Sequence, residues 1–338
     1  MSKLSVIIPT YNRSRLVTEA IDSVLSQRCD HAIEVIVVDD GSADDTRAVL
    51  ESYGDRIRYR HQPNQGMNAA RNHGVRLATG DYVAFLDSDD AWLPFKAALQ
   101  IAVLERLPHV GFAFSNFYTW RGSDRIADGL GKWMVAGTPM IQHCTNVLSS
   151  DAIGIGEEAE PFRIGLCEIY RLSLDQPVVL PSTSILRREV VEAMGPLPED
   201  NWMCGDWEYF ARASKRFGAA YIEKETALNR SHDDAVRLMR RDLTDRTRQR
   251  IESIERIWKA DGEFLSRHRD DVVRAEVREW ATLFRTACHA GDWKQARAHL
   301  ERIGTLAGHV PWELRLRWWA ARTPGVRTVI ATARRAAR

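Results

Sequence analysis

Short apolar runs recur along the first 90 residues and are separated by stretches with polar positions. The runs at residues 4–8, 33–38 and 82–86 are rich in branched or aromatic side chains, which is typical of buried strands. A shorter run at residues 57–60 has the same character. The run at residues 33–38 is nearly all apolar, as expected for a parallel strand that is covered on both faces. We therefore predict four strands in this part of the chain.

The stretches between these runs predict helices. We expect the first helix to begin at a cap residue, Asn12 or Ser14, and to bury the apolar face that ends at Leu25. Further helices are expected at residues 44–53 and 67–77. The resulting order, strand and helix in strict alternation, predicts an α/β sheet with right-handed crossovers, helices on both faces and mostly parallel strands.

The pattern is less regular after residue 100. We expect strands at residues 110–114 and 219–222 and helices at residues 188–193 and 206–217. Between residues 121 and 175 the periodicity fades and Gly, Ser and acidic residues dominate, which predicts a long, variable loop region.

The last hundred residues are rich in Arg and have helical periodicity throughout. The expected helices are residues 237–260, 270–289, 292–303 and 311–321. We therefore divide the chain into an α/β domain, residues 1–230, and a C-terminal α-helical region, residues 231–338.

Composition narrows the class of protein. The 338 residues suffice for one large domain and an appendage, and the net charge of +1 gives no bias toward nucleic acid. The five cysteines lie far apart, are odd in number and form no CxxC pair, which argues against a disulfide framework or structural zinc site and for a reducing compartment. No apolar run reaches the roughly 20 residues of a spanning helix. We expect a cytoplasmic protein, with peripheral membrane contact left open.

The acidic run Asp87-Ser88-Asp89-Asp90 directly follows the buried strand at residues 82–86. Packed carboxylates repel one another, so they must be hydrated, protonated or bound to a cation. Mg²⁺ and Mn²⁺ take oxygen ligands and leave positions open for substrate phosphates. The run therefore predicts a metal–diphosphate site at a strand end. The alternative is an acidic loop that caps a helix beginning near Trp92.

Two more polar clusters follow strands. Pro9, Thr10 and Tyr11 come after the first strand, and Asp39-Asp40 comes after the second. Ligands of open α/β sheets bind at the carboxyl ends of the strands, so the three clusters should meet at one edge. There a Tyr ring can stack on a base and a carboxylate can accept a hydrogen bond from it. Taken singly, each residue also has an ordinary structural interpretation, with Tyr11 as a core residue and Asp40 as a turn residue.

Four motifs in order resemble those of the family 2 glycosyltransferases with the GT-A fold. They are Val6-Ile7-Ile8-Pro9-Thr10-Tyr11-Asn12, Glu34 to Ser42, Gly66 with Ala69-Ala70-Arg71-Asn72, and Leu86 to Asp90. The resemblance is strong over residues 3–118 and returns at residues 181–184 and 205–210. It implies a Rossmann-like sheet and an inverting, nucleotide-sugar-dependent transferase.

The resemblance also implies roles for single residues. Pro9, Thr10 and Tyr11 border the base, Asp40 accepts from it, with Asp39 the less favoured choice, and Arg71 lies near the donor. Asp87 and Asp89 form a DxD motif around Ser88, with Asp89 the principal ligand of Mn²⁺ or Mg²⁺, Asp87 also facing ribose, and Asp90 in an assisting role.

Two further positions concern the chemistry. Asp206 is implied as the general base, with Glu208 as the alternative; either acid can instead serve only the first turn of the predicted helix. The sequence departs from the family's usual Glu-Asp pair, because Gly205 precedes Asp206. His232 resembles a late position that approaches the metal or diphosphate, and its alternative is an ordinary loop histidine.

The sequence thus predicts a metal-dependent glycosyltransferase that moves a sugar from a nucleoside-diphosphate donor to a glycan or lipid-linked acceptor, in surface polysaccharide or glycan biosynthesis. A sugar nucleotidyltransferase is a weaker alternative, because it needs a glycine-rich phosphate loop after the first strand. A non-catalytic nucleotide-sugar-binding protein is the third. Residues 311–338 mix Trp with Arg, which fits either a helical bundle or contact with an anionic membrane surface.

Overall fold

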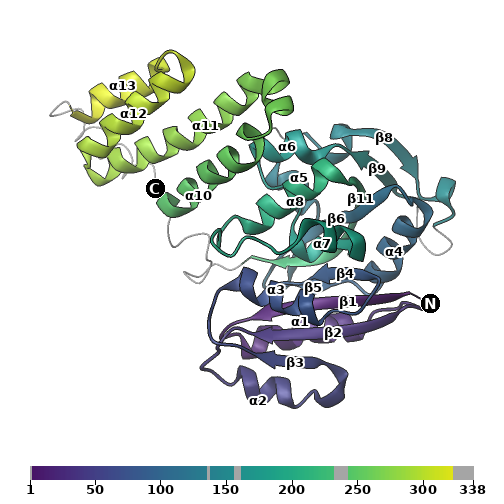
Figure 1. Cartoon of the computed structure of the whole chain (residues 1–338). Helices are drawn as coiled ribbons and strands as arrows, with labels where there is room; N and C mark the ends of the chain where they lie inside the picture. The colour runs from purple at the N-terminus through teal and green to yellow at the C-terminus, as the bar shows by residue number, and fades with distance from the viewer. Residues whose placement is uncertain (1, 135–137, 156–160, 232–242, 323–338) are drawn as a thin grey trace. The chain divides into compact units, whose positions relative to one another are not determined.

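Two compact units, Met1–Val236 and Arg237–Arg338, make up the computed structural model of the chain (Figure 1). The structure describes residues 2–134, 138–155, 161–231 and 243–322. The assignment of residues 1–230 to a transferase domain and of residues 231–338 to a separate region stays a prediction.

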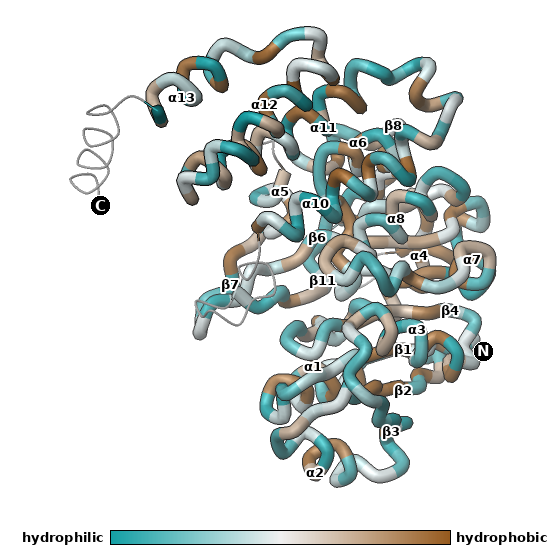
Figure 2. Tube along the Cα trace, turned by 60° about the vertical axis from the view of Figure 1, so that its left-hand side comes forward, coloured by the Kyte–Doolittle hydropathy of each residue, from teal (hydrophilic) through white to brown (hydrophobic). Residues whose placement is uncertain are grey.

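Four parallel strands form the first half of the sheet in the order β3-β2-β1-β4. They are β1 (Lys3–Thr10), β2 (Ala32–Asp39), β3 (Arg58–His61) and β4 (Tyr82–Phe85). The helices that connect them are α1 (Ser14–Leu25), α2 (Thr46–Glu51) and α3 (Met67–Leu77). Both α1 and α3 pack on β1 and β2. This is the predicted α/β arrangement, and Figure 2 shows the apolar colour concentrated in β1, β2 and β4.

The second half of the sheet is mixed and continues the order as β4-β10-β6-β11-β9-β8. Its strands are β6 (Val110–Arg121), β8 (Cys144–Ser149), β9 (Arg163–Cys167), β10 (Ser184–Arg187) and β11 (Gly218–Arg230). Strand β10 runs antiparallel to both neighbours, whereas β6 and β11 are parallel. The helices of this half are α4 (Lys96–Arg106), α7 (Arg188–Met194) and α8 (Gly205–Arg216).

The region between residues 121 and 175 corrects the sequence prediction, because it is not a long loop. It contains β7 (Asp124–Ile126), α5 (Gly129–Trp133), β8, β9 and α6 (Ile169–Asp175). Strand β9 pairs with the distant β11, and β8 adds to β9 as the outermost strand. The strands among these short elements are stabilised by pairing with distant strands, so local periodicity did not predict them.

Two smaller corrections concern helix starts. Trp92 does not begin a helix; Ala91–Trp92 form the short strand β5, which pairs with β11, and α4 starts at Lys96. The cap of α1 is Arg13 rather than Asn12 or Ser14, and it makes no side-chain cap bond.

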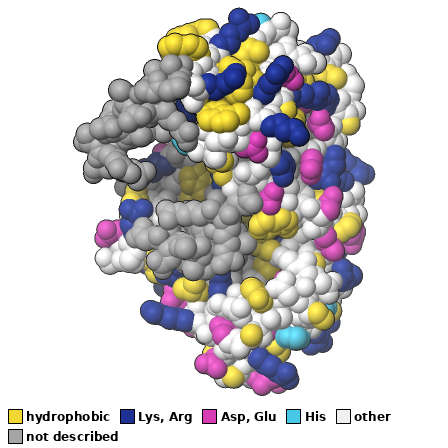
Figure 3. Space-filling view, turned by 90° about the vertical axis from the view of Figure 1, so that its left-hand side faces the viewer, with side chains coloured by type: hydrophobic (Ala, Val, Ile, Leu, Met, Phe, Trp, Pro, Cys, Tyr) yellow, Lys and Arg dark blue, Asp and Glu magenta, His cyan; other side chains and the backbone are white. Residues whose placement is uncertain are grey.

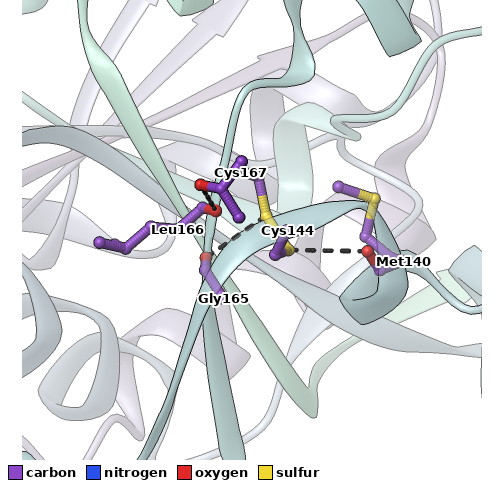
Figure 4. The surroundings of a disulfide bond; sticks show 6 residues. Met140, Cys144, Gly165, Leu166 and Cys167 are labelled. Atoms are coloured by element: carbon purple, nitrogen blue, oxygen red, sulfur yellow. Dashed lines mark hydrogen bonds between the residues drawn. A yellow bond between two sulfur atoms is a disulfide. The ribbon is translucent and has the colours of Figure 1, made fainter.

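A disulfide joins Cys144 to Cys167 (Figure 4), which corrects the expectation of no disulfide. The two cysteines lie opposite each other on the antiparallel strands β8 and β9. A separation of 23 residues gave no sign of this pairing, because the sequence did not predict either strand. The argument for a reducing compartment rested partly on unpaired cysteines and loses that support.

The C-terminal unit is helical, as predicted. It contains α10 (Leu243–Ile254), a π-helical turn (Glu255–Lys259), α11 (Gly262–Ala290), α12 (Trp293–Ala307) and α13 (Trp312–Arg322). Helix α11 is kinked at His268, whose backbone leaves helical geometry. Phe284, Ile303 and Leu314 are central to the core that α11, α12 and α13 share. In the part of the chain that the structure describes, no helix is long and apolar enough to cross a membrane.

Candidate active site

The carboxyl ends of β1, β2 and β4 lie at one edge of the sheet. In the strand register Thr10 is opposite Asp39 and Ile7 is opposite Phe85. The Asp40 amide donates to the Thr10 carbonyl at 2.9 Å, so the pairing extends into the segment after β2. The polar clusters that follow the three strands are therefore neighbours, as the sequence predicted.

The segment after β1 presents Tyr11 to solvent. Its side chain is 48% exposed, which excludes the interpretation of Tyr11 as a core residue. The next residue, Asn12, has a positive φ of 50° and accepts from the Ala43 amide at 2.8 Å. These contacts hold the Tyr11 segment against the loop after β2. Pro9 and Thr10 are buried below it.

Asp39 and Asp40 are both buried, and each has internal partners. Asp39 accepts from the Ser42 amide at 2.9 Å and from the Tyr59 hydroxyl at 3.2 Å. The Asp40 carboxylate accepts from the Gln62 side chain and from the amides of Gln65 and Gly66, at 2.8–2.9 Å. A carboxylate offers about four acceptor positions, so these three hydrogen bonds leave Asp40 about one. Its main structural effect is to fix the turn that leads into α3.

Asp87 is bound by a buried arginine. Arg71, on α3, is fully buried and donates through Nη2 to Asp87 Oδ1 at 2.6 Å and through Nη1 to Asn68 Oδ1 at 3.2 Å. Arg71 has no exposed surface, so it contacts the partly exposed Asp87 rather than solvent. From the sequence we expected Arg71 near the donor. In the structure it is buried behind Asp87 and bonds the Asp87 carboxylate.

Asp89 has a different arginine partner from Asp87. Its Oδ2 is 2.7 Å from Arg13 Nη1, so the segment after β1 and the acidic run are joined by an ion pair. The Asp89 carbonyl accepts from Arg230 Nε at 3.1 Å, at the end of β11. The Arg230 guanidinium also pairs with Glu19 and lies 3.8 Å from the centre of the Trp120 ring. Two arginines thus flank Asp89.

Asp90 is buried, unlike the other two carboxylates of the run. It accepts from the Ser182 hydroxyl at 2.6 Å, from the Asn229 amide group at 3.1 Å and from the Arg230 backbone at 3.1 Å. Burial raises the pKa of Asp90 well above its usual value, and the charges of Asp89 and Asp87 add to this. The sequence left open that the acidic run caps a helix, but Asp90 does not do so. It joins the acidic run to η4 (Pro181–Thr183) and β11.

Ser182 holds this turn in shape. Its hydroxyl accepts from the Asp87 amide at 3.1 Å while donating to Asp90, and its carbonyl accepts from Trp92 Nε1 at 2.8 Å. Ser88, which the sequence grouped with the nucleotide-sugar-binding residues, is buried within the turn. The exposed carboxyl groups of the run are therefore those of Asp87 and Asp89, whose side chains are 22% and 17% exposed.

Asp206 is the second residue of α8, and its pKa responds to the charge of Asp87. Burial raises the pKa of Asp206, the nearby Arg71 guanidinium opposes that rise, and the Asp87 charge adds to it. Glu208 is 5% exposed and accepts from Asn201 Nδ2 at 3.1 Å. Because Asp206 is the more accessible of the two, the geometry favours it over Glu208 as an acid–base residue. Both acids also sit in the first turn of α8, where carboxylates are favourable.

The acidic turn offers two partly exposed carboxylates, those of Asp87 and Asp89, to a divalent cation. Among the described residues no group of three or more His, Cys, Asp or Glu side chains could enclose a metal ion. Mg²⁺ sites, however, often use one or two carboxylates and complete their shell with water and substrate phosphates. Asp87 and Asp89 are the two partly exposed carboxylates of the turn, so they are the candidates for such a site. His232, the third predicted ligand, lies outside the described residues.

Sequence reasoning missed several residues of the site, among them Arg13, Asn68, Ser182 and Arg230. Arg13 directly follows the Tyr11-Asn12 segment, so its position was a usable signal. Asn68 lies three residues before Arg71, on the same face of α3. The contacts of Ser182 and Arg230 with the acidic run span 92 and 141 residues and have no local signal.

Comparison with known families identifies the N-terminal half. The model described as Glycosyl transferase family 2 matches residues 5–173, which is half of the chain. An uncharacterized glycosyltransferase of Rickettsia bellii is 46% identical over 154 residues, 45% of this chain and 21% of that protein. A Campylobacter jejuni protein named GalNAc(5)-diNAcBac-PP-undecaprenol beta-1,3-glucosyltransferase is 45% identical over 98 residues, 28% of this chain and 31% of that protein.

Solved structures agree on the fold. S. aureus TarS 1–349 in complex with UDP gives a TM-score of 0.53 at 19% identity, over 91% of this chain and 92% of that one. The Pyrobaculum calidifontis mannosyltransferase PcManGT, in complex with GDP-Man and Mn²⁺, gives 0.52 at 20% identity, over 95% and 84%. The matches to the curated relatives are shorter. The chain covers 21%, 17% and 32% of the length of the first three of them.

Proposed function

The chain belongs to glycosyl transferase family 2, and on that premise we propose that it transfers a sugar from a nucleoside-diphosphate donor to an acceptor hydroxyl with inversion at the anomeric carbon. One observation carries the proposal. Asp87, Arg71 and Asp206 come from three separate segments and form one electrostatic group at the ligand-binding edge of the sheet.

The donor half of the site follows from the strand ends. The exposed Tyr11 ring can stack on the base, and Asp40 can accept from it with its remaining lone pair. The diphosphate then lies toward the acidic turn. A Mn²⁺ or Mg²⁺ ion held by Asp87 and Asp89 would neutralise charge on the departing diphosphate. Arg13 supplies further positive charge beside Asp89.

The acceptor half centres on Asp206. An acceptor hydroxyl is too weakly acidic to attack unaided, so a positioned carboxylate must take its proton in the transition state. The raised pKa of Asp206 makes it a stronger base than an exposed aspartate. A single in-line displacement at the anomeric carbon breaks the bond to the diphosphate oxygen and forms the bond to the acceptor oxygen. This geometry inverts the centre.

Two alternatives have less support. A sugar nucleotidyltransferase needs a glycine-rich phosphate loop after the first strand, and that position holds Pro9-Thr10-Tyr11-Asn12. A non-catalytic binding protein has no need of a basic carboxylate, and Asp206 supplies one beside the donor carboxylate Asp87.

We further propose a lipid-linked or glycan acceptor in surface polysaccharide biosynthesis, at the inner face of the membrane. The name of the Campylobacter relative includes an undecaprenol-linked acceptor. In this chain, α13 places Trp312, Leu316 and Trp319 at helical spacing, and they are 69%, 54% and 59% exposed. Arg315 and Arg322 are exposed beside them.

Apolar and basic side chains gather together at the top of the face in Figure 3, over the C-terminal unit. Trp and Arg on one helix suit the interface of an anionic lipid surface, because the rings enter the headgroup region while the guanidinium groups meet anionic lipid. The inward face of α13, with Leu314 and Trp318, packs on Phe284 and Trp293. The bundle and the membrane interpretations thus apply to different faces of one helix. Residues 323–338 lie outside the described part of the chain.

The test of the activity is Asp206→Asn against the unaltered protein. We expect the wild type to turn over one member of a panel of UDP-glucose, UDP-N-acetylglucosamine and GDP-mannose with Mn²⁺. The variant should lose about 10²- to 10⁴-fold in turnover, the usual contribution of a general base. Its thermal stabilisation by the matching nucleotide should persist, because Asp206 does not hold the donor. Near-normal turnover in Asp206→Asn would remove Asp206 as the base.

A further inference from the structure

One face of α3 carries three buried polar side chains that face two different parts of the site. Asn68, Arg71 and Asn72 lie at helical spacing and are 2%, 0% and 2% exposed. Arg71 contacts Asp87, as described above. Asn68 and Asn72 instead contact residues 197–201, more than 120 positions away in the sequence.

The contacts of Asn68 fix the backbone just before α8. Its Nδ2 donates to the carbonyls of Pro198, at 2.8 Å, and Asn201, at 3.0 Å. Its Oδ1 accepts from Arg71 Nη1 at 3.2 Å. A single carboxamide therefore joins the arginine that binds Asp87 to the segment that leads into Asp206.

Asn72 secures the start of the same segment. Its Nδ2 donates to the Leu197 carbonyl at 2.9 Å, and its Oδ1 accepts from the Leu197 amide at 2.8 Å. At the other end of the segment, Asn201 accepts from the Cys204 amide at 3.1 Å and donates to Glu208 on α8. The segment from Leu197 to Cys204 is thus bound to α3 on one side and to α8 on the other.

Gly205 lies against Asn68, and no side chain fits between them. A Cβ at position 205 would be 2.2 Å from Asn68 Nδ2 and 2.9 Å from the Pro198 carbonyl oxygen. Gly205 has ordinary helical geometry, so its backbone does not require glycine. The requirement comes from the close approach of the Asn68 carboxamide. This accounts for the departure at the position before Asp206, where the sequence has Gly instead of the Glu that the resemblance predicts.

We propose that Asn68 is a positioning residue for Asp206, and that Gly205 is the residue its close approach requires. The proposal rests on the proposed function for the identity of the base. Asn68 touches no reacting atom; it fixes the distance between the donor carboxylate Asp87 and the base Asp206 by holding Arg71 with one atom and the segment before α8 with the other. Both amide atoms are used, so neither Asp nor Ala can replace it.

The first test adds one methyl group at Gly205. We expect Gly205→Ala to lower the turnover number for the accepted donor at least tenfold, while the Kd for the matching nucleotide, UDP or GDP with Mn²⁺, changes less than threefold. Gly262→Ala is the matched control, because Gly262 also begins a helix and has no atom within 4 Å of its Cβ position. Alanine favours helices over glycine, so the control should keep or raise its melting temperature.

The second test does not depend on activity. Asn68→Asp keeps the acceptor for Arg71 but replaces the donor to the two carbonyls with a second oxygen. We expect faster amide hydrogen exchange in a peptide covering residues 197–205, relative to the wild type and to Asn146→Asp, which makes the same change at an exposed position of β8. Exchange equal to that of the control would overturn the proposal.

The two tests separate the possible failures. If the wild type turns over no donor in the panel, the proposed function fails, and the exchange experiment still decides whether Asn68 holds the segment. If the wild type is active and Gly205→Ala turns over the donor as fast as Gly262→Ala, the positioning role fails while the function stands.

Discussion

At the scale of single residues, three adjacent carboxylates have three different environments. Asp87 is bound by the buried Arg71, Asp89 by the partly exposed Arg13, and Asp90 by neutral donors in the interior. The sequence presents the three as one acidic run. Only their partners separate two carboxylates that can face a cation from one that joins segments of the fold.

This difference predicts a large loss of Mn²⁺ affinity for one of two similar substitutions and a small change for the other. Asp89→Asn should weaken Mn²⁺ binding at least tenfold in calorimetric titration with UDP present, because it removes one of two charged ligands. Asp90→Asn should change it less than threefold, since burial already favours the neutral form of Asp90. An equal loss of Mn²⁺ affinity in both variants would contradict this division of roles.

The raised pKa of Asp206 predicts the acid side of the pH profile. A general base acts only when ionised, so donor turnover should fall as the pH decreases through the pKa of Asp206. Because burial raises that pKa, turnover should begin to fall at a higher pH than it would for an ordinary aspartate, whose pKa is about 4. The turnover number measured between pH 4 and 8 tests this. Glu208→Gln should keep the same acidic limb; if it abolishes the limb, Glu208 is the base.

At the scale of elements, local pattern predicted the helices and strands that bury their own apolar face. The helix predicted at residues 67–77 is α3, Met67–Leu77, and the strands β1, β2 and β4 lie where apolar runs placed them. Strands β8 and β9 were missed, because their stability comes from pairing with each other and with β11. A strand of five or six residues with mixed polarity has no pattern of its own to detect.

The disulfide between β8 and β9 should stabilise this edge of the sheet. Closing a loop of 23 residues restricts the unfolded chain and is worth about 3 kcal/mol by the chain-entropy model. We therefore expect dithiothreitol to lower the melting temperature of the oxidised protein and to leave Cys144→Ser/Cys167→Ser unchanged. Cys29→Ser, which removes a free cysteine, should respond to reductant as the wild type does. Equal melting temperatures with and without reductant would show that the bond does not form in solution.

At the scale of the whole molecule, the two units make different contributions. The N-terminal unit contains every described residue of the candidate active site, from Tyr11 to Arg230. The C-terminal unit is a helical bundle whose last described helix, α13, keeps a second apolar stripe on its surface. The composition of the whole chain, with a net charge of +1, does not reveal this local combination of Trp and Arg.

Vesicle sedimentation tests the surface of α13. We expect the full chain to bind vesicles with 40% phosphatidylglycerol more strongly than pure phosphatidylcholine, and to lose binding in high salt, because each Arg near the surface adds about 1 kcal/mol that salt screens. Trp312→Ala/Leu316→Ala/Trp319→Ala should remove the binding. The matched control Leu25→Ala/Ile126→Ala/Val147→Ala, at exposed apolar positions of the other unit, should keep it. Equal binding by the two triple variants would exclude α13 as the contact.

The sequence by itself determined the α/β class, the four parallel strands and the convergence of Tyr11, Asp40 and Asp87 on one edge. These follow from local periodicity and from the rule that parallel strands bring their carboxyl ends together. The acidic run also indicated a cation, and the resemblance to the family implied that Asp206 is the base.

The tertiary structure alone decided what holds those groups in place. The contacts of Arg13 with Asp89, of Ser182 with Asp90 and of Asn68 with the Asn201 carbonyl before α8 join residues that are 76, 92 and 133 positions apart. Such contacts produce no periodic pattern in the sequence, because each joins two segments that meet only in the folded sheet. The reason for glycine at position 205 belongs to this class, since it lies in the distance to Asn68 and not in the residues beside it.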